Sequence, residues 1–232
     1  DTLLSHASTS TRRGSAFGVH QALDQTGAIA GPLLLAAVLS LHADNYRLAF
    51  GVLIVPGVLV LLLLFWLRFR VPDPRTYEEA HSVSTTPEPT VTTTTLPAHR
   101  RLPKRFWQYV ATIGVLSCGV ATFPLLAYHA QRTGLLDDAQ VPLVFAAAMA
   151  VDGAAGLIFG RIYDKHGPRV LLVVPVAAAC SAVAFTDNVA AIWIGVAVWG
   201  IVHGVLDSTV KAVITELVPV DVRAIAFGWL AL

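Results

Sequence analysis

The chain has 232 residues, of which 55% are hydrophobic and 13% charged, and its formal net charge is +1. Soluble domains carry about 25% charged residues, so this composition excludes an ordinary soluble domain. The net charge gives no reason to expect a nucleic-acid partner, and none is predicted.

The predicted elements are apolar stretches long enough to cross a bilayer. A helix of about 20 mostly apolar residues spans the hydrocarbon core, where lipid offers no partner to an open backbone N–H or C=O. The sequence predicts six spans at residues 16–40, 46–67, 106–130, 140–159, 170–185 and 189–213, and a seventh that starts at residue 224 and is cut off at 232. The predicted fold class is therefore an all-α, polytopic membrane helix bundle. Because the chain begins at Asp1 and stops inside an apolar run, we expect a piece of a longer protein.

The polar residues between the spans indicate an orientation. Of the 16 Lys and Arg residues, all but Arg47 and Arg132 fall in alternate gaps, which places 14 on one side. Cytoplasmic loops retain Lys and Arg, so that side is predicted to be cytoplasmic, in the inner (plasma) membrane. Residues 71–104 are rich in Pro, Thr, Ser and Glu and lie on the same side, which predicts a flexible cytoplasmic linker.

Ionisable residues inside the first span are candidates for function. A charge at the bilayer centre costs about 3 kcal/mol on insertion scales, so it must face protein or water. Asp24 lies near mid-membrane, with His20 one turn before it on the same face and Gln21 beside that face. Two interpretations stay open: the His20–Asp24 pair shares a coupling proton, or it makes a structural hydrogen bond between helices.

The later spans also contain ionisable residues. His203, Asp207 and Lys211 recur at i, i+4 and i+8, which aligns them on one stripe of the sixth span. The stripe either takes part in transport or balances its own charge structurally. Asp152 lies in a helix of small residues, where it either lines a cavity or bonds to a neighbouring helix.

Small residues favour close helix packing. Gly27 and Gly31 are four positions apart and precede Pro32, and Gly156 and Gly160 have the same spacing, which lets helix backbones approach in lipid.

The sequence contains no nucleotide-binding glycine loop, no His or Cys cluster with metal spacing and no nucleophile elbow. We therefore expect no enzyme activity, catalytic residue, cofactor or metal site.

Three segments together resemble the major facilitator superfamily. Residues 160–169 (GRIYDKHGPR) are similar to the signature cytoplasmic loop of that family, with Gly160, Asp164, Lys165, Gly167 and Arg169 at its glycine, acidic and basic positions. Residues 27–32 (GAIAGP) resemble the Gly-Pro motif of the fifth helix, and residues 218–228 (VPVDVRAIAFG) resemble the entry to the eleventh. Among members of the family, the chain resembles uncharacterised bacterial ones.

The resemblance implies a domain organisation. The spans would be helices five to ten and the start of eleven. Residues 1–70 would form the last part of an N-terminal bundle, with two spans, and residues 105–232 the first part of a C-terminal bundle, with four spans and the start of a fifth. Residues 71–104 would link the two halves.

The resemblance also implies a function: a secondary active transporter that moves a small solute by alternating access, coupled to protons. The expected partners are the lipid bilayer, a small-molecule solute and protons. The candidate residues of the cavity or coupling site are His20, Gln21, Asp24, Asp152, His203 and Asp207. The signature loop is a candidate cytoplasmic gate, whose charges either latch one conformation or only set topology. Gly160 and Gly167 are expected to permit the tight reversal between the two helices that it joins. The alternative function is a receptor or scaffold that keeps the fold without transport. A channel is disfavoured because no span shows a polar stripe from end to end.

Overall fold

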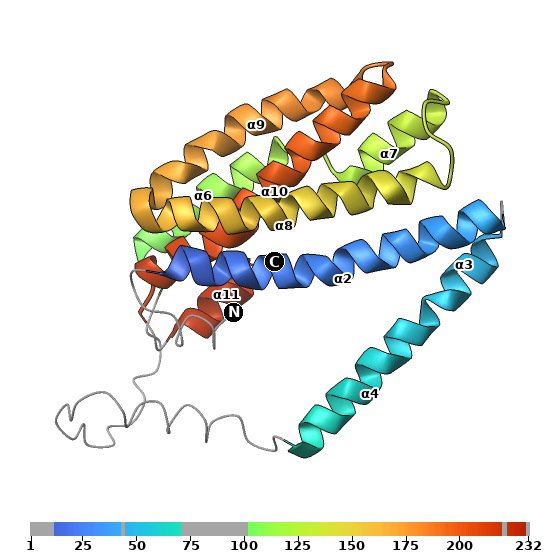
Figure 1. The fold of residues 1–232 in the computed structure, drawn as a ribbon. Coiled ribbons are helices and arrows are strands. Elements are labelled where there is room, and N and C mark those ends of the chain that lie inside the picture. The colour runs from blue at the N-terminus through green and yellow to red at the C-terminus, as the bar shows by residue number, and fades with distance from the viewer. Residues whose placement is uncertain (1–11, 43–44, 71–101, 220–221, 231–232) are drawn as a thin grey trace. The chain divides into compact units, whose positions relative to one another are not determined.

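The computed structural model describes residues 12–42, 45–70, 102–219 and 222–230, and within these ranges every regular element is a helix (Figure 1). The helices are α2 (Arg13–Leu41), α3 (Tyr46–Val52), α4 (Ile54–Arg70), α6 (Lys104–Cys118), α7 (Phe123–Arg132), α8 (Gln140–His166), η1 (Gly167–Leu172), α9 (Val173–Ser181), η2 (Ala182–Phe185), α10 (Val189–Leu217) and α11 (Arg223–Leu230). The predicted all-α fold class is confirmed.

The described residues contain five helical stretches that are long and apolar enough to cross a membrane. Four of them, at residues 13–41, 46–66, 104–132 and 189–217, each match one predicted span. The fifth runs from residue 140 to residue 185 and contains the two predicted spans 140–159 and 170–185, because α8 passes directly into η1. The chain reverses at Gly167, whose φ of 64° is a left-handed conformation that favours glycine. From that turn η1 and α9 lead back in the opposite direction (Figure 1).

The third predicted span is interrupted. Instead of one helix over residues 106–130, the structure has α6 and α7 separated by residues 119–122. Pro124 lies in the first turn of α7, where a missing backbone N–H costs nothing, so it starts a helix rather than kinking one. The break leaves backbone groups unpaired by the helix at this level of the span.

The chain divides into two compact units, residues 1–46 with 101–232, and residues 47–100. In the first unit α10 is the most buried helix because it packs against α8, α9 and α2, while α2 also packs along α8. Phe17, Val202 and Val205, at most 1% exposed, lie in its apolar core. Packing of this kind fixes the relative register of α2, α8 and α10.

The second unit contains α4 and most of α3. Large apolar side chains of α4, among them Leu61, Leu63 and Phe65, are more than half exposed. An exposed apolar helix of this kind suits lipid better than water. The predicted linker at residues 71–104 lies almost wholly outside the described residues, and α6 begins at its last residue, Lys104.

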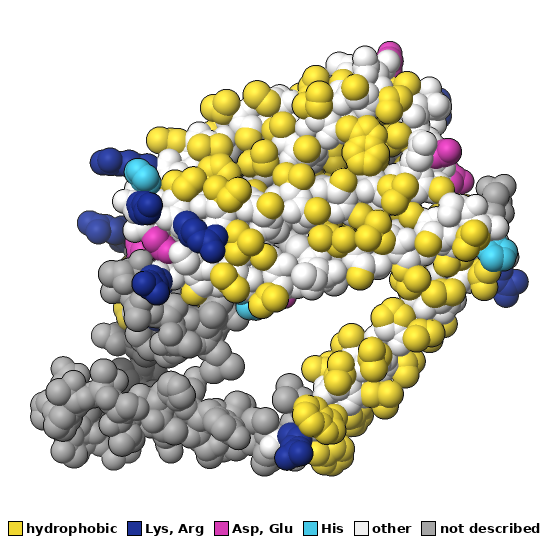
Figure 2. Space-filling model, in the orientation of Figure 1, with side chains coloured by type: hydrophobic (Ala, Val, Ile, Leu, Met, Phe, Trp, Pro, Cys, Tyr) yellow, Lys and Arg dark blue, Asp and Glu magenta, His cyan; other side chains and the backbone are white. Residues whose placement is uncertain are grey.

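Charge on the first unit is concentrated at the ends of its helices. Figure 2 shows Lys and Arg gathered where α8 meets η1, while apolar side chains cover the flank between the ends. Arg161, Lys165 and Arg169 are exposed at that end. Asp137 and Asp187 are exposed before α8 and α10, at the opposite end of these helices. This asymmetry is the one that the positive-inside pattern of the sequence requires.

Candidate functional site

Helices α2 and α8 approach so closely that only glycine fits at two levels of their contact. A Cβ atom built on Gly14 would overlap the carbonyl oxygen of Gly160, and one on Gly18 would overlap the carbonyl oxygen of Gly156. The predicted packing role of Gly156 and Gly160 is therefore seen against α2. This close approach brings polar side chains of α2 within hydrogen-bonding distance of α8.

Gly27 and Gly31 behave differently. A Cβ atom at either position would meet nothing within 4 Å among the described residues. The packing role of Gly27, Gly31 and Pro32 therefore stays a prediction.

Helix α10 contacts α8 through glycine in the same way. A Cβ atom on Gly204 would overlap the carbonyl oxygen of Asp152, and Gly200 lies equally close to the backbone of Ala148. Three helices thus meet around Asp152, two of them nearly at backbone contact with α8.

A buried polar cluster occupies that meeting point. The side-chain amide of Gln21 (α2) donates to Asp152 Oδ1 (α8) at 3.2 Å and to Asp207 Oδ2 (α10) at 3.1 Å. The amide of Gln25 (α2) donates to Asp152 Oδ2 at 2.9 Å. Gln21, Gln25 and Asp152 are 5%, 7% and 2% exposed. We call these four side chains the Asp152 cluster. Of the residues predicted from the sequence, Gln21, Asp152 and Asp207 do meet.

Charges around the cluster come mainly from α10. Asp207 interacts electrostatically with Asp152, with His203 and Lys211 of its own helix, and with Asp24 of α2. The predicted stripe of α10 therefore leads into the cluster. Two carboxylates at a buried site repel each other, and the bridging amide of Gln21 reduces this cost only in part.

The predicted pair of His20 and Asp24 forms within one helix. His20 Nδ1 lies 3.2 Å from Asp24 Oδ2, one turn apart on α2, and the two side chains are 40% and 61% exposed. Gln21 and Gln25 instead face α8 and α10. The polar residues of α2 thus divide between an exposed pair and a buried pair.

Gln25 was not among the site residues predicted from the sequence. It lies one turn after Gln21, and this i, i+4 spacing puts both amides on one face, a signal that was available. Its Oε1 is buried and has no hydrogen-bond partner among the described residues.

A cavity of about 370 Å³ lies between the break in the third span and α10. Trp199 and His203 line it from α10, with their ring centroids 4.1 Å apart, and Ser117 and Thr122 contribute hydroxyl groups from the other side. Trp199 Nε1 donates to the backbone oxygen of Ala121 at 2.6 Å, which uses one of the carbonyl groups that the break exposes. A cavity of this size can hold a small organic molecule.

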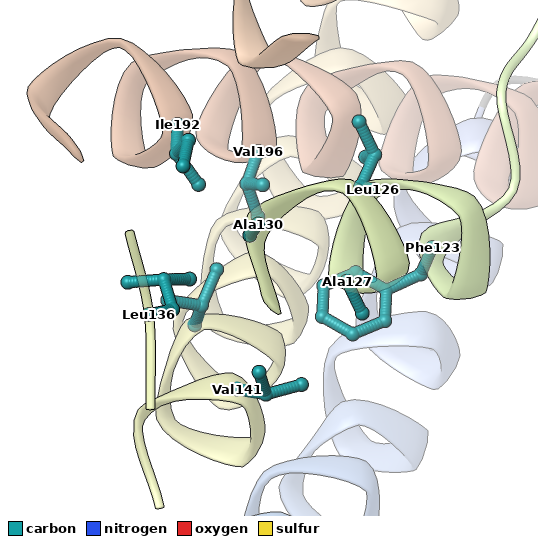
Figure 3. Close-up of a pocket in the computed structure, with 9 residues that line it drawn as sticks. Phe123, Leu126, Ala127, Ala130, Leu136, Val141, Ile192 and Val196 are labelled. Carbon is teal, nitrogen blue, oxygen red and sulfur yellow. The ribbon is translucent and has the colours of Figure 1, made fainter. Parts of the chain in front are cut away.

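A second, apolar void is much smaller. Figure 3 shows Leu126, Leu136, Val141 and Ile192 among the side chains around it, and its volume is about 10 Å³. That is about the space of one water molecule, and the lining offers it no polar partner. This void belongs to the packed core and is not a ligand site.

The predicted gating loop ties the end of α8 to the start of α2. Asp164 Oδ1 accepts from the backbone N–H of Gly14 at 2.7 Å, and Oδ2 accepts from that of Ser15 at 2.9 Å and from the Ser15 hydroxyl. The first N–H groups of a helix lack partners within it and carry partial positive charge, so a carboxylate stabilises this end. Lys165 is exposed beside it.

The two glycines of the loop serve different purposes. Gly167 makes the predicted reversal, and Arg169 beyond it is exposed in η1. Gly160 was expected to take part in the turn, but it lies inside α8 and packs on Gly14. The expectation for Gly160 as a turn residue is therefore corrected, because helix contact rather than backbone freedom requires glycine there.

The described residues contain no group of three or more His, Cys, Asp or Glu side chains that could hold a metal ion. What the Asp152 cluster and the cavity offer is hydrogen bonding, proton exchange and aromatic contact.

A family model described as Major Facilitator Superfamily matches residues 1–232. The chain is 42% identical over 229 residues to uncharacterised proteins of Mycobacterium bovis and of two strains of Mycobacterium tuberculosis. The match covers 98% of this chain and 54% of each relative, so the chain spans about half the length of the curated relatives it matches. No solved structure matches the chain significantly.

Proposed function

Because this chain belongs to the Major Facilitator Superfamily, whose members are generally membrane transporters, we propose that it is part of a secondary active transporter that moves a small solute by alternating access. The observation that carries the proposal is the contact of α2 with α8 and α10. Glycine packing lets these helices touch, and the side chains that join them at its centre are polar. Polar bonds at the centre of such a contact can be exchanged for bonds to water when the helices part.

The gating loop supports the same proposal. Asp164 binds the start of α2 through charge and hydrogen bonds, which can break when the helices part and re-form when they close. We propose that this bond is a latch on the cytoplasmic side, with Lys165 and Arg169 next to lipid headgroups.

Proton coupling is the proposed energy source. The support is the presence of ionisable groups within the spans, in the His20–Asp24 pair and in the Asp152 cluster, which can bind and release a proton. The cavity beside Trp199 and His203 is the proposed path or binding space of the solute. His203 lies one turn from Asp207 and so connects the cavity to the cluster.

The proposed location is the inner (plasma) membrane, with the 71–104 linker in the cytoplasm. The support is the gathering of Lys and Arg at one end of the first unit. Cysteines introduced one at a time into the linker should react with a membrane-impermeant reagent only after the cells are opened. Reaction in intact cells would contradict this orientation.

A receptor or scaffold with the same fold is the alternative. It is favoured by the hydrogen bonds that the amides of Gln21 and Gln25 donate to buried Asp152 and half-buried Asp207, which a static bundle also needs. The cavity of about 370 Å³ favours transport instead, since a packed scaffold has no use for it.

The full-length protein in proteoliposomes can decide between the two. Solutes of several chemical classes are offered with and without an imposed pH gradient, and a transporter should accumulate at least one of them. Gly18→Ala, which prevents α2 from closing on α8, should abolish that accumulation. A protein that moves no solute, and whose α2–α8 contact never opens, would be a scaffold.

A further inference from the structure

We infer that Asp152 is the proton-carrying group of this protein, and that Gln25 is the acceptor that makes proton binding favour closure of α2 on α8. The inference rests on the proposed function, because it takes the α2–α8 contact as one that opens and closes. Among the candidate carboxyl groups that the sequence gives, it selects Asp152 rather than Asp24 or Asp207.

The unpartnered acceptor is the observation that carries this inference. Gln25 is 7% exposed, its Nε2 donates to Asp152 Oδ2 at 2.9 Å, and its Oε1 has no hydrogen-bond partner among the described residues. A buried amide oxygen without a partner is costly. A carboxylate cannot relieve this cost, since ionised Asp152 has only acceptors.

A protonated Asp152 removes the cost of the unpartnered amide oxygen of Gln25. A neutral carboxyl group next to a carboxamide can make two bonds, in which the amide N–H donates to one carboxyl oxygen and the carboxyl O–H donates to the amide oxygen. Only the first of these bonds exists with the carboxylate. One proton therefore satisfies Gln25 and removes a negative charge from beside Asp207.

The proton is bound only while α2 stays against α8. When the helices separate, water reaches both Gln25 and Asp152, and neither then needs the other. The proton is taken from water on the side to which the site is open, binds a carboxylate oxygen of Asp152, and returns to water when α2 leaves α8. The end at which Asp164 bonds to the start of α2 carries the Lys and Arg residues and is the proposed cytoplasmic end. When the helices part there, the proton is released toward the cytoplasm.

Other groups near Asp152 respond less directly to this contact. Asp207 already has His203 and Lys211 as charged or titratable neighbours on α10, and it accepts a bond from Gln21. His20 and Asp24, also on α2, lie on its exposed face, where their side chains are 40% and 61% exposed. A sodium ion fits less well than a proton. Two amide N–H groups point at the Asp152 carboxylate, and their partial positive charge would repel a metal cation there.

The test measures closure directly. In the full-length protein, all native cysteines, Cys118 and Cys180 included, are replaced, and Arg12→Cys and Arg161→Cys carry spin labels near the contact of Gly14 and Gly160. Pulsed dipolar distances in proteoliposomes then give the ratio of closed to open molecules as the pH varies. If closure binds one more proton, that ratio should rise about tenfold for each unit that the pH falls, within the window where the proton is exchanged.

Three variants make the test specific. Asp152→Asn should stay closed at every pH, because its amide N–H can donate to Gln25 Oε1 permanently. Gln25→Met should lose most of the pH response, and it keeps the inference open to test if Asp152→Asn does not fold. Asp138→Asn is the matched control, since Asp138 accepts from Gln131 at 2.9 Å in the same kind of pair on the surface, and it should keep the full response.

Two results separate the inference from the proposed function. A single closed distance at every pH, without an open population, would contradict alternating access itself. Two populations that ignore pH, that respond to added sodium at constant pH, or that keep their pH response in both Asp152→Asn and Gln25→Met would overturn the assignment of Asp152 alone.

Discussion

Asp164, at the end of α8, accepts a hydrogen bond at 2.7 Å from the backbone N–H of Gly14, in the first turn of α2. The two residues are 150 positions apart in the chain, on either side of the predicted linker. This bond adds a polar connection to the apolar packing of Phe17 and Tyr163 at the same end of the contact.

Removing the charge of Asp164 should weaken this end of the contact. Asp164→Asn keeps one acceptor oxygen for the start of α2 and loses the carboxylate charge and its second acceptor. We expect the closed population to fall about fivefold to tenfold, or about 1 kcal/mol, as for the loss of a charged helix cap. The spin-label pair at residues 12 and 161 reports the change, and a closed population equal to that of the wild type would rule out a latch.

Adding one methyl group at Gly18 should prevent closure. In Gly18→Ala the new Cβ overlaps the carbonyl oxygen of Gly156, so α2 must move away from α8. We expect the accumulation of solute to be lost while the protein is still made and inserted. Gly114→Ala is the control, because a Cβ there meets nothing within 4 Å in the described part of the chain. Equal flux in both variants would show that the contact need not be so close.

The bridging amide of Gln21 should matter for stability. Gln21→Leu leaves half-buried Asp207 without this donor and buried Asp152 with the Gln25 amide alone, which should cost about 2–4 kcal/mol of the free energy of unfolding. Thermal unfolding in detergent measures the loss. Gln131→Leu removes a similar but exposed amide–carboxylate bond and should cost less than about 1 kcal/mol. Similar melting temperatures for the two variants would mean that the cluster is open to water.

The indole N–H of Trp199 should stabilise the break between α6 and α7. Trp199→Phe keeps an aromatic ring against His203 but loses the bond to the Ala121 oxygen. We expect a loss of about 1–2 kcal/mol in the free energy of unfolding, since the carbonyl group is left without this donor. Trp193→Phe on the same helix, with an indole that is 40% exposed, is the comparison and should change stability little. Equal losses would show that ring size rather than the hydrogen bond matters.

Asp24, although it belongs to a candidate coupling pair, should not carry the coupling proton. Its pair with His20 is largely exposed, so Asp24→Asn should change the free energy of unfolding by less than about 1 kcal/mol. We expect the flux of solute to fall while the ratio of flux with and without a pH gradient stays the same, because Asp152 carries the proton. A gradient effect that disappears in Asp24→Asn would return the coupling role to the His20–Asp24 pair.

Much of the architecture could be predicted from the amino-acid sequence. Length and apolarity alone predict spans, because lipid forces a backbone to satisfy its own hydrogen bonds, and four of the six predicted spans each match one membrane-length stretch of the described residues, although the stretch at 104–132 is interrupted. The i, i+4 pairing of His20 and Asp24 also follows from helix geometry and is present. The break at residues 119–122 was not predicted, since the residues around it are as apolar as a continuous helix would require.

The site depended on tertiary structure. Helical periodicity places Gln21 and Gln25 on one face of α2, but it cannot say that Asp152 and Asp207 lie opposite that face. It also cannot say whether Gly160 serves a turn or a helix contact, since glycine suits both.

What the sequence determined by itself is therefore the solvent of each segment, the direction in which the charged ends point, and which residues share a helix face. These follow from interactions within a few residues or with the bilayer. What only the tertiary structure decided is which faces meet, and so which carboxyl groups are buried together and which acceptor is left without a partner. That outcome depends on contacts more than 120 residues apart in the chain, and such contacts are set by the packing of whole helices.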